Sequence, residues 1–518
     1  MGRTVPLALA AAGVLALAAP SAFAARGFHY GVTAAEVTSK SAVVWARPDK
    51  AGRYTAQVAT NKRFTSGVKS RKVTATSRSD LTVQTRFRGL KSNRVYYYRF
   101  KAGKKVSDVG RFHTAPAPNA NATVRFAWSG DEDAQPAVGS KKPFWGPMKA
   151  FGTMARQRHN LFSINLGDTI YSDSEVANQG ALASTLSQKR AKYKMNLAQK
   201  NYQRIREASG MYNEWDDHEF VNDFTKSENG NAIYKVGSKA FREYMPVTYH
   251  SATGLYRSFR WGKNVELFFL DERSFRSAKA SANHVCDNPL THQPDNAPTA
   301  PQSTRSAFAV LDPEFSQPVS PACLAAINDP NRTFLGRSQL ALLERALQHS
   351  SATWKVLVNE VPIQQFYALP YDRWEGYAAE RTKLLTFLSR KVKNSVFLTT
   401  DVHANLVNDA RFQTLEPGGP KNSGITEFTT GPVATRTFTG EIDNTLGKPG
   451  SGQLVTQLFF HPQPPSGVGM QCANTNINSF GEVTANAKTF KVRLLDQNGR
   501  PIKDVSGGAC GPFTLKKK

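Results

Sequence analysis

The chain has 518 residues, of which 40% are hydrophobic and 21% are charged. These values are close to those of an average globular protein, so they exclude a disordered chain, a collagen and a coiled coil. The length suggests roughly two to four domains. Because 67 Lys and Arg residues outnumber 40 Asp and Glu residues, the formal net charge is +27. We therefore expect anionic partners such as phosphate compounds, lipid head groups, cell-wall polymers or nucleic acid.

Residues 1–24 have the pattern of a secretory signal peptide. Arg3 precedes an apolar run, and Ala22-Phe23-Ala24 fits the A-x-A rule for cleavage. We expect cleavage after Ala24. A retained anchor is the alternative, although the run is short and rich in alanine for a membrane span. Because this segment has no pair of adjacent arginines, the sequence predicts a Sec-type signal and a secreted, extracytoplasmic protein.

Export permits disulfide bonds. The chain has four cysteines, which allow three pairings. Nearness in sequence favours Cys286–Cys323 and Cys472–Cys510, and the absence of a C-x-x-C spacing argues against a structural zinc site. The first pair lies in residues 284–330, which are rich in Pro, Asn and Ser. We interpret this segment as a stapled loop over or beside the functional site.

Residues 26–115 are predicted to form an all-β module, because short strand-like runs recur at the spacing of a β-sandwich. Leu90 and Tyr96, six positions apart, resemble the tyrosine corner of fibronectin type III sandwiches, with Trp45 in the place of the core tryptophan. We expect these aromatic residues to be core residues and expect no chemistry in this module. The composition of residues 114–122 is that of a linker.

After residue 122, apolar runs end abruptly at acidic residues. Such runs precede Asp131, Asp168, Asp271 and Asp401. Strands buried on both faces are continuously apolar and are typical of α/β folds, in which ligands lie beyond the carboxyl ends of the strands. The sequence therefore predicts a layered α/β catalytic domain over residues 122–515, in which these four strand ends converge on one crevice.

Three motifs at the strand ends combine groups that bind metal ions. Gly-Asp-Thr-Ile-Tyr (167–171) places a carboxylate, which can bridge two metals, near a phenol, whose phenolate suits Fe(III). Trp-Asp-Asp-His-Glu-Phe (215–220) contains three carboxylates and an imidazole, and burying these groups costs free energy unless ions or hydrogen bonds compensate them. Asp-Val-His (401–403) places a carboxylate and an imidazole on one side of the chain. A single carboxylate at a strand end is more often a cap or a turn former, so the prediction depends on the combination.

Together these motifs resemble the calcineurin-like and purple acid phosphatase metallophosphoesterases. Trp-Asp-Asp-His-Glu, in place of the Gly-Asn-His-Glu of related enzymes, indicates the PhoD-like alkaline phosphatases. The resemblance spans nearly all of the mature chain, including the β-sandwich, and implies a catalytic domain of two mixed sheets flanked by helices. Further segments similar to this family are residues 270–276, 335–339, 353–357, 374–381 and 427–432.

The resemblance also implies roles for individual residues. His218 corresponds to the proton donor for the leaving group. Arg273 or Arg276 is expected to hold phosphate oxygens, because a guanidinium group matches them bidentately. The expected cofactors are Fe(III) and Ca²⁺ in a multinuclear site, with another divalent metal as the alternative. The expected metal ligands are Asp131, Asp168, Tyr171, Asp217, Asp401 and His403.

One position departs from the family pattern. Much of the family has Ser-Cys at the end of the first strand, where the Cys is a metal ligand, whereas this chain has Ser129-Gly130-Asp131. Asp131 resembles the Gly-Asp of other metallophosphoesterases, and Asp133 is a competing candidate. A carboxylate in place of a thiolate makes the site harder, which leaves the ion at this position open.

The resemblance implies an exported phosphohydrolase that releases phosphate from monoesters or diesters through attack by a metal-activated hydroxide. One alternative is a phosphodiesterase or phospholipase D that acts on lipid or cell-wall phosphodiesters. Another is a non-catalytic, polyanion-binding wall protein. The sequence has no recognised nucleic-acid motif, so only nonspecific, salt-sensitive contact with nucleic acid is expected. The expected partners are phosphate-ester substrates and, nonspecifically, anionic wall or lipid surfaces, with the protein as a monomer.

Overall fold

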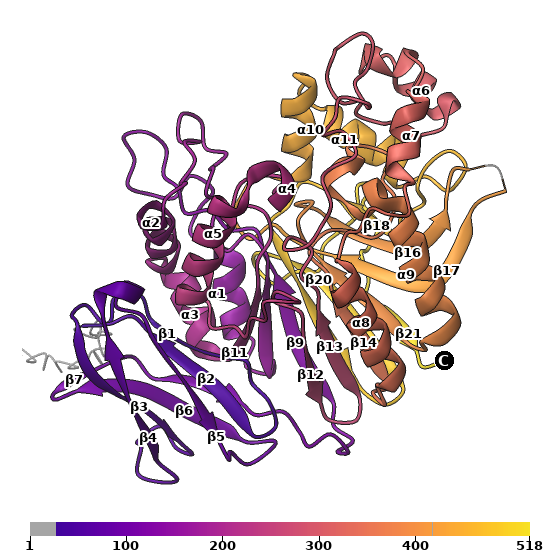
Figure 1. The fold of residues 1–518 in the computed structure, drawn as a ribbon. Coiled ribbons are helices and arrows are strands. Elements are labelled where there is room, and N and C mark those ends of the chain that lie inside the picture. The colour runs from indigo at the N-terminus through magenta and orange to yellow at the C-terminus, as the bar shows by residue number, and fades with distance from the viewer. Residues whose placement is uncertain (1–26, 417) are drawn as a thin grey trace, which may run out of the picture.

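The computed structural model describes residues 27–416 and 418–518, so the predicted signal peptide lies outside the described residues. Two large β-sheets and the helices beside them form most of the chain, and a smaller sheet lies near its beginning (Figure 1). The predicted fold class, a β-rich N-terminal part followed by a layered α/β part, is confirmed. Within the described residues, no helix has the length and apolar composition needed to cross a membrane.

The first large sheet has nine strands. In spatial order they are β21 (Phe513–Lys516), β20 (Thr489–Asp496), β19 (Ser479–Ala485), β9 (Val124–Ser129), β10 (Phe162–Leu166), β11 (Gly210–Glu214), β1 (Val32–Ala35), β2 (Ser41–Ala46) and β5 (Val83–Arg88). Strands β9, β10 and β11 are parallel. Strand β1 pairs with β11 in parallel as well, with Ala34 opposite Gly210. One sheet therefore continues from the N-terminal strands into the α/β part.

The second large sheet has seven strands. In spatial order they are β12 (Arg257–Trp261), β13 (Val265–Phe269), β14 (Trp354–Val358), β15 (Ser395–Thr399), β17 (Lys421–Thr429), β16 (Asn405–Gln413) and β18 (Cys472–Asn474). Strands β13, β14, β15 and β17 are parallel, and the others are antiparallel to their neighbours. Both large sheets are therefore mixed, as the resemblance implies.

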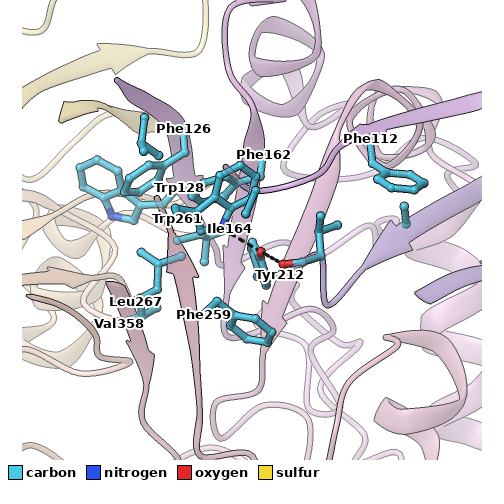
Figure 2. Close-up of a cluster of buried hydrophobic side chains, with 14 of the residues drawn as sticks. Phe112, Phe126, Trp128, Phe162, Ile164, Tyr212, Phe259, Trp261, Leu267 and Val358 are labelled. Atoms are coloured by element: carbon cyan, nitrogen blue, oxygen red, sulfur yellow. Dashed lines mark hydrogen bonds between the residues drawn. The ribbon is translucent and has the colours of Figure 1, made fainter. Parts of the chain in front are cut away.

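Aromatic side chains fill the space between the two large sheets (Figure 2). The ring of Phe162 on β10 lies 4.7 Å from that of Phe126 on β9 and 4.4 Å from that of Trp261 on β12. Trp261 Nε1 donates a hydrogen bond of 3.0 Å to the hydroxyl of Tyr212, so the indole N–H is satisfied inside the core. Because truncation of a buried aromatic residue costs about 3–5 kcal/mol, this interface fixes the two sheets, and hence their strand ends, relative to each other.

Helices cover the outer faces of the two sheets. Those on the first sheet are α1 (Lys149–Arg156), α2 (Leu186–Leu197), α3 (Lys200–Ala208) and α5 (Asn231–Tyr244), and those on the second are α8 (Arg337–His349) and α9 (Ala378–Lys391). On α8, Leu340, Leu343 and Leu347 are buried in a cluster with α9, as their helical spacing predicts. The sequence predicts a polar, basic helical segment over residues 184–206, and the structure has two helices there, α2 and α3.

The smaller sheet packs against β1, β2 and β5. Its strands are β4 (Lys69–Ala75), β3 (Gly52–Ala59), β6 (Val95–Ala102) and β7 (Lys105–Val106), with β8 (Gly110–His113) beside β6. The backbone N–H of Lys91 donates a hydrogen bond of 2.9 Å to the hydroxyl of Tyr96, which is the contact that a tyrosine corner makes.

Trp45 has a different place from the one predicted. Its Nε1 donates a hydrogen bond of 2.7 Å to the carbonyl of Glu243 on α5, and the indole is buried in the helical layer rather than between the two sheets of the sandwich. Successive side chains of a strand point to opposite faces. Because the neighbouring Val44 faces the sandwich interior, Trp45 faces the helices, and the prediction that it is the sandwich's core tryptophan is wrong.

Short helices gather beyond the strand ends of the α/β part. They are α4 (Lys226–Asn229), α6 (Gln302–Phe308), α7 (Pro321–Ile327), α10 (Phe438–Leu446) and α11 (Ser451–Val455). The single turns are η1 (Ser77–Ser79), η2 (Pro313–Ser316) between α6 and α7, η3 (Pro370–Asp372), η4 (Trp374–Tyr377) and η5 (Thr456–Phe460), which directly follows α11. Figure 1 shows α6 and α7 beside α10 and α11. The segment predicted as a stapled loop contains α6 and α7, and both predicted disulfides, Cys286–Cys323 and Cys472–Cys510, are present.

Candidate active site

The turns after β9, β10, β11 and β15 bring four predicted site residues to one crevice. Asp131, Asp168 and Asp401 follow the last residue of their strands by two positions, and Asp217 follows by three. The hydroxyl of Thr400 donates a hydrogen bond of 2.6 Å to the carbonyl of Leu166. This bond joins the end of β15 in one sheet to the end of β10 in the other, so the carboxylates of two sheets meet at one edge.

The backbone at these turns has a conformation that side chains other than Gly rarely adopt. The φ angles of Asp131, Asp168, Asp401 and His403 are 64°, 48°, 64° and 51°. Left-handed residues other than Gly cost free energy and persist where the surrounding structure imposes them, often at functional sites. At these four residues, the fold therefore imposes an unfavourable backbone conformation that directs their side chains to one crevice.

The ligand atoms of the predicted residues form overlapping groups. Those of Asp131, Asp168 and His403 lie within 4.8 Å of one another, and the same limit holds for Asp168, Asp217 and His218. A third such group contains Asp216, Asp217 and Asp401. The structure thus brings five of the six predicted metal ligands into a continuous chain. The sixth, Tyr171, places its hydroxyl 2.8 Å from His403 Nε2.

The electrostatics of this crevice fit the binding of cations. Both carboxylate oxygens of Asp131 are buried, and neither has a hydrogen-bond partner among the described residues. Burial, and after it the charge of Asp216, raises the pKa of Asp131 well above its usual range. Burial does the same for the pKa of Asp168. Unpaired buried carboxylates are costly unless a metal ion or a proton compensates them, so the donor set fits hard cations.

The site cavity, which we call the acidic cavity, has a volume of about 310 Å³. It opens beside the predicted ligands and is bordered by α10 on one side. Its lining residues are Asp168, Glu175, Asp217, His218, Asn222, Asp223, Leu369, Tyr371, Asp372, Arg373, Asp401, Val402, His403, Phe438, Glu441 and Thr445.

His218 is held in a fixed orientation at the cavity wall. Its ring stacks on that of Tyr171 with 4.0 Å between centroids. Its backbone N–H donates a hydrogen bond of 3.2 Å to Asp168 Oδ1, and its Nδ1 lies 2.7 Å from Asp173 Oδ1. Burial lowers the pKa of His218, but the carboxylates of Asp173, Asp168 and Asp217 outweigh burial and raise it well above its usual range. The imidazole is therefore placed to carry a proton.

The family model of the PhoD-like phosphatases matches residues 132–467, and the model of the N-terminal domain of PhoD-like phosphatases matches residues 14–116. The chain belongs to the PhoD-like phosphatase family. The family predicted from the sequence is confirmed.

Individual relatives of this PhoD-like chain agree with that assignment. It is 27% identical to alkaline phosphatase D of Bacillus subtilis (strain 168) over 435 residues, which are 75% of this chain and 66% of the relative, just under two thirds of its length. Its fold is similar to a solved structure of PhoD, with a TM-score of 0.71 and 22% identity over 96% of this chain and 91% of the other. The yellow lupin (Lupinus luteus) purple acid phosphatase PPD1 has a TM-score of 0.56 and 11% identity over 94% and 74% of the chains.

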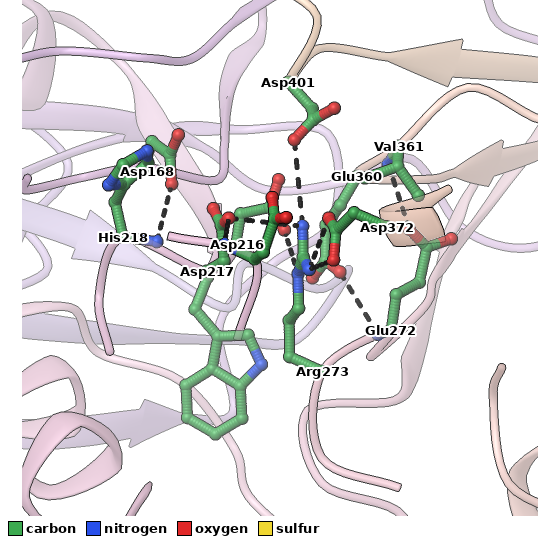
Figure 3. A network of polar contacts seen from close by, with 12 residues as sticks. Asp168, Asp216, Asp217, His218, Glu272, Arg273, Glu360, Val361, Asp372 and Asp401 are labelled. Carbon is green, nitrogen blue, oxygen red and sulfur yellow. Dashed lines mark hydrogen bonds and ion pairs between the residues drawn. The ribbon is translucent and has the colours of Figure 1, made fainter. Parts of the chain in front are cut away.

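The two predicted phosphate-binding arginines of this PhoD-like chain pair with carboxylates, and Figure 3 shows Arg273 among them. The Arg273 side chain is fully buried. Its Nε pairs with Asp216, its Nη1 lies 2.7 Å from Asp372, and its Nη2 lies 3.7 Å from Asp401. Arg276 Nη1 lies 3.0 Å from Asp372. The arginine that lines the acidic cavity is Arg373, which the motifs did not indicate.

Two acidic residues singled out in the sequence have other roles. Asp271 follows the last residue of β13 by two positions, yet its oxygens accept hydrogen bonds from Trp215 Nε1, at 3.1 Å, and from the backbone N–H of Leu255, at 2.8 Å. The expectation that this fourth strand end joins the crevice is therefore wrong, because its carboxylate is occupied in shaping a neighbouring turn. Asp133, the competitor of Asp131, accepts hydrogen bonds from Ser174 Oγ at 2.5 Å and from a backbone N–H, which leaves Asp131 in the crevice.

The Gly in the position of the family's Cys has a steric explanation. A Cβ atom on Gly130 would lie 2.3 Å from the carbonyl oxygen of Leu166. The turn after β9 therefore lies too close to the end of β10 for any side chain. A Cys does not fit here without a shift of the backbone, and Asp131 is the residue that reaches the crevice instead.

Sequence reasoning missed several residues of the site. Asp173 and Glu175 follow Tyr171 by two and four positions, and this short spacing from a predicted metal ligand could have indicated that they belong to the site. Glu441 comes from α10, far along the chain, and no motif surrounds it. Its carboxyl meets that of Glu175, and burial, followed by this partner, raises the pKa of Glu441 to about 8, while the pKa of Glu175 is lowered to about 2. The ligand atoms of Glu175, Glu441 and His403 lie within 4.8 Å of one another.

Proposed function

We propose that this member of the PhoD-like family is a metal-dependent phosphohydrolase that releases phosphate from phosphate monoesters or diesters. The observation that carries the proposal is the set of carboxylates and imidazoles that turns from two sheets bring to the acidic cavity. Beside Asp168 and His403 of this set lies Asp131, whose buried oxygens have no hydrogen-bond partner among the described residues. A site with this excess of buried negative charge binds phosphate only when cations are present.

The proposed metal ligands are those of the sequence analysis. We propose Fe(III) beside Tyr171, since a phenolate suits a trivalent iron, and Ca²⁺ beside Asp217 and Asp401, since Ca²⁺ prefers carboxylate oxygens. Another divalent metal in place of Ca²⁺ is the alternative. When bound, the ions supply Lewis acidity that neutralises phosphate charge and lowers the pKa of water. The full proposed set is Asp131, Asp168, Tyr171, Asp217, Asp401 and His403.

The side chains of the protein are proposed to bind the phosphate and to protonate the leaving group. His218 Nε2 is proposed to donate a proton to the leaving oxygen, while Asp173 holds Nδ1 and fixes the ring. We propose that Arg273 contacts phosphate oxygens through its Nη2, which has no hydrogen-bond partner among residues 27–416 and 418–518. Arg276 acts through Asp372, which both arginines bind. The side chain of Phe438 excludes water from one wall of the cavity.

Location and partners are part of the proposal. Two disulfides support an exported protein, and the net charge of +27 supports nonspecific association with anionic wall or lipid surfaces. We propose a monomer. The second candidate function is a phosphodiesterase or phospholipase D acting on lipid or wall phosphodiesters, and the apolar cavity described below favours substrates with an organic substituent. A non-catalytic polyanion-binding protein is the remaining alternative.

The test is hydrolysis of 4-nitrophenyl phosphate and bis(4-nitrophenyl) phosphate by the purified protein, from neutral to alkaline pH, with added calcium and after chelation. We expect hydrolysis that requires metal, and the ratio of the two rates separates a monoesterase from a diesterase. Absence of hydrolysis in a protein that contains iron indicates a narrow natural substrate. Absence of both hydrolysis and metal contradicts the enzyme proposal and leaves the binding protein.

A further inference from the structure

An apolar cavity of about 100 Å³ adjoins the acidic cavity. It lies between α6 on one side and α10 with η5 on the other, and Figure 1 shows α6 and α10 in one group of helices beyond the strand ends. The Phe308 and Phe459 rings, from α6 and η5, meet edge to face with 5.5 Å between centroids at its wall. Its apolar lining side chains include those of Ala300, Phe308, Leu311, Ile442, Leu446 and Phe459.

The two cavities share part of their walls. Leu369, Arg373, Phe438 and Thr445 line both. Phe438 is the first residue of α10, and its backbone N–H donates a hydrogen bond of 3.1 Å to the carbonyl of His403. The wall of the apolar cavity is therefore attached directly to a proposed metal ligand, and the two cavities adjoin at these four residues.

Leu369 stands at the junction in a strained conformation. Its φ angle is 47°, and its backbone N–H donates a hydrogen bond of 2.7 Å to the carbonyl of Asn296, which holds the turn. The side chain is 39% exposed although it is apolar. Strained backbone conformations of bulky residues occur mainly at functional sites. Exposed apolar side chains at a cavity often contact a ligand. Leu369 combines both features.

Arg373 supplies a positive charge at the same junction. The residue is 8% exposed, and its buried Nε has no hydrogen-bond partner among the described residues. Its Nη2 donates to the carbonyl of Ala368. A guanidinium group with an unused donor suits an anion that lies between the two cavities. The junction thus matches a molecule with an anionic head and an apolar substituent.

We propose that the apolar cavity binds an aliphatic chain carried by a phosphate ester whose phosphoryl group lies in the acidic cavity. This inference rests on the proposed function and narrows its substrates to esters of apolar alcohols. The occupant is the chain of the substrate itself, because the shared wall and Arg373 join this cavity to the acidic one. A preformed apolar pocket beside a few polar groups is the usual design of such a subsite.

The test measures inhibition of 4-nitrophenyl phosphate hydrolysis by n-alkylphosphonates from methyl to octyl, below their micelle concentrations. We expect the inhibition constant to fall by up to about fourfold per methylene, the value for full burial, until the cavity is filled. Leu446→Gln makes the wall polar, and Ala300→Phe fills the space. Both are expected to flatten this series while the inhibition constant of methylphosphonate stays unchanged.

Leu454→Gln is the matched control. Leu454 lies on α11, is 37% exposed and is not among the lining residues, so this variant is expected to keep the wild-type series. An inhibition constant that is independent of chain length in the wild type overturns the inference, as does a Leu446→Gln series equal to that of Leu454→Gln. If 4-nitrophenyl phosphate is not hydrolysed, calorimetric titration of the metal-loaded protein with the same phosphonates tests the cavity separately from the proposed function, which fails only if the protein also binds no metal.

A second arm distinguishes the sources of such a chain. Unilamellar vesicles of dioleoylphosphatidic acid are incubated with the wild type, Leu446→Gln and Leu454→Gln, and phosphate release is measured. Release that falls only in Leu446→Gln assigns the cavity to lipid drawn from a bilayer. An intact phosphonate series without release from vesicles assigns it to aliphatic esters free in solution.

Discussion

Asp173 Oδ1 lies 2.7 Å from Nδ1 of His218, so the two side chains form a carboxylate–imidazole pair at the wall of the acidic cavity. Asp173 also accepts a hydrogen bond of 2.7 Å from the backbone N–H of Asn222 through its other oxygen. The carboxylate is therefore fixed on both sides, and Nε2 of the imidazole that it holds has no hydrogen-bond partner among the described residues.

Asp173→Asn is expected to lower kcat by about 10- to 100-fold, because an ionised partner that orients His218 is replaced by a neutral one. The loss should be larger for alkyl phosphates than for 4-nitrophenyl phosphate, whose leaving group needs less protonation. Since Asp173 raises the pKa of His218, its removal should move the alkaline limb of the rate profile to lower pH. Steady-state kinetics over a pH series measure both effects.

The control for this change is Asp409→Asn. Asp409 accepts a hydrogen bond from Gln471 in an exposed position away from the acidic cavity, and this variant should leave the profile unchanged. An Asp173→Asn enzyme with equal losses on both leaving groups and an unmoved alkaline limb contradicts the role of His218 as proton donor.

In the metal-free protein, the free energy of unfolding should fall as the pH rises. Burial raises the pKa values of Asp131, Asp168 and Asp401 well above their usual range, so the folded metal-free protein binds more protons than the unfolded chain. The free energy of unfolding is then largest at acidic pH and falls as the pH rises above about 4. Urea unfolding at pH 5 and pH 8, with and without chelator, measures the trend. A chelated protein that is more stable at pH 8 than at pH 5 refutes this account.

Asp131→Asn should have opposite effects on the two forms of the protein. In the metal-free protein it removes a buried, unpaired negative charge and should raise Tm. In the metal-loaded protein it removes a proposed ligand and should lower both Tm and metal content. Calorimetry of the two forms gives the comparison, and a fall in Tm for both forms would indicate a packing role instead.

Gly130→Cys is expected to destabilise the protein rather than restore the ligand of the wider family. The added Cβ would lie 2.3 Å from the carbonyl oxygen of Leu166, and such overpacking costs about 1–3 kcal/mol. Gly180→Ala is the control, because its Cβ would lie 3.2 Å from the nearest atom, the carbonyl oxygen of Ser174. Urea denaturation measures both, and a Gly130→Cys protein of wild-type stability shows that the turn adapts.

Much of this architecture is predictable from local sequence. The apolar runs before Asp131, Asp168 and Asp401 indicate buried strands, and a carboxylate after each one indicates a common crevice, because parallel strands present their carboxyl ends to the same edge. The run before Asp271 has the same pattern but a different outcome. The Asp271 carboxylate accepts hydrogen bonds from Trp215 and Leu255. Nothing in the apolar run before Asp271 distinguishes it from the runs before the three aspartates that reach the crevice.

The contributions of distant segments could not be predicted in this way. Glu441 reaches the site because α10 packs over it, and Trp45 is buried by α5, which is about 200 residues away in sequence. Arg373 lies at the junction of two cavities that exist only once α6, α10 and η5 have packed together. Such positions depend on tertiary packing, about which local periodicity contains no information.

The metal content of the wild type and of Asp168→Asn, purified in parallel and assayed on 4-nitrophenyl phosphate, tests the central claim most directly. Asp168 belongs to two of the overlapping ligand groups, so its loss should affect more than one ion. We predict iron and calcium in the active wild type, and loss of metal together with loss of activity in Asp168→Asn. An active wild type without bound metal, or an Asp168→Asn protein with full metal and full activity, contradicts the account.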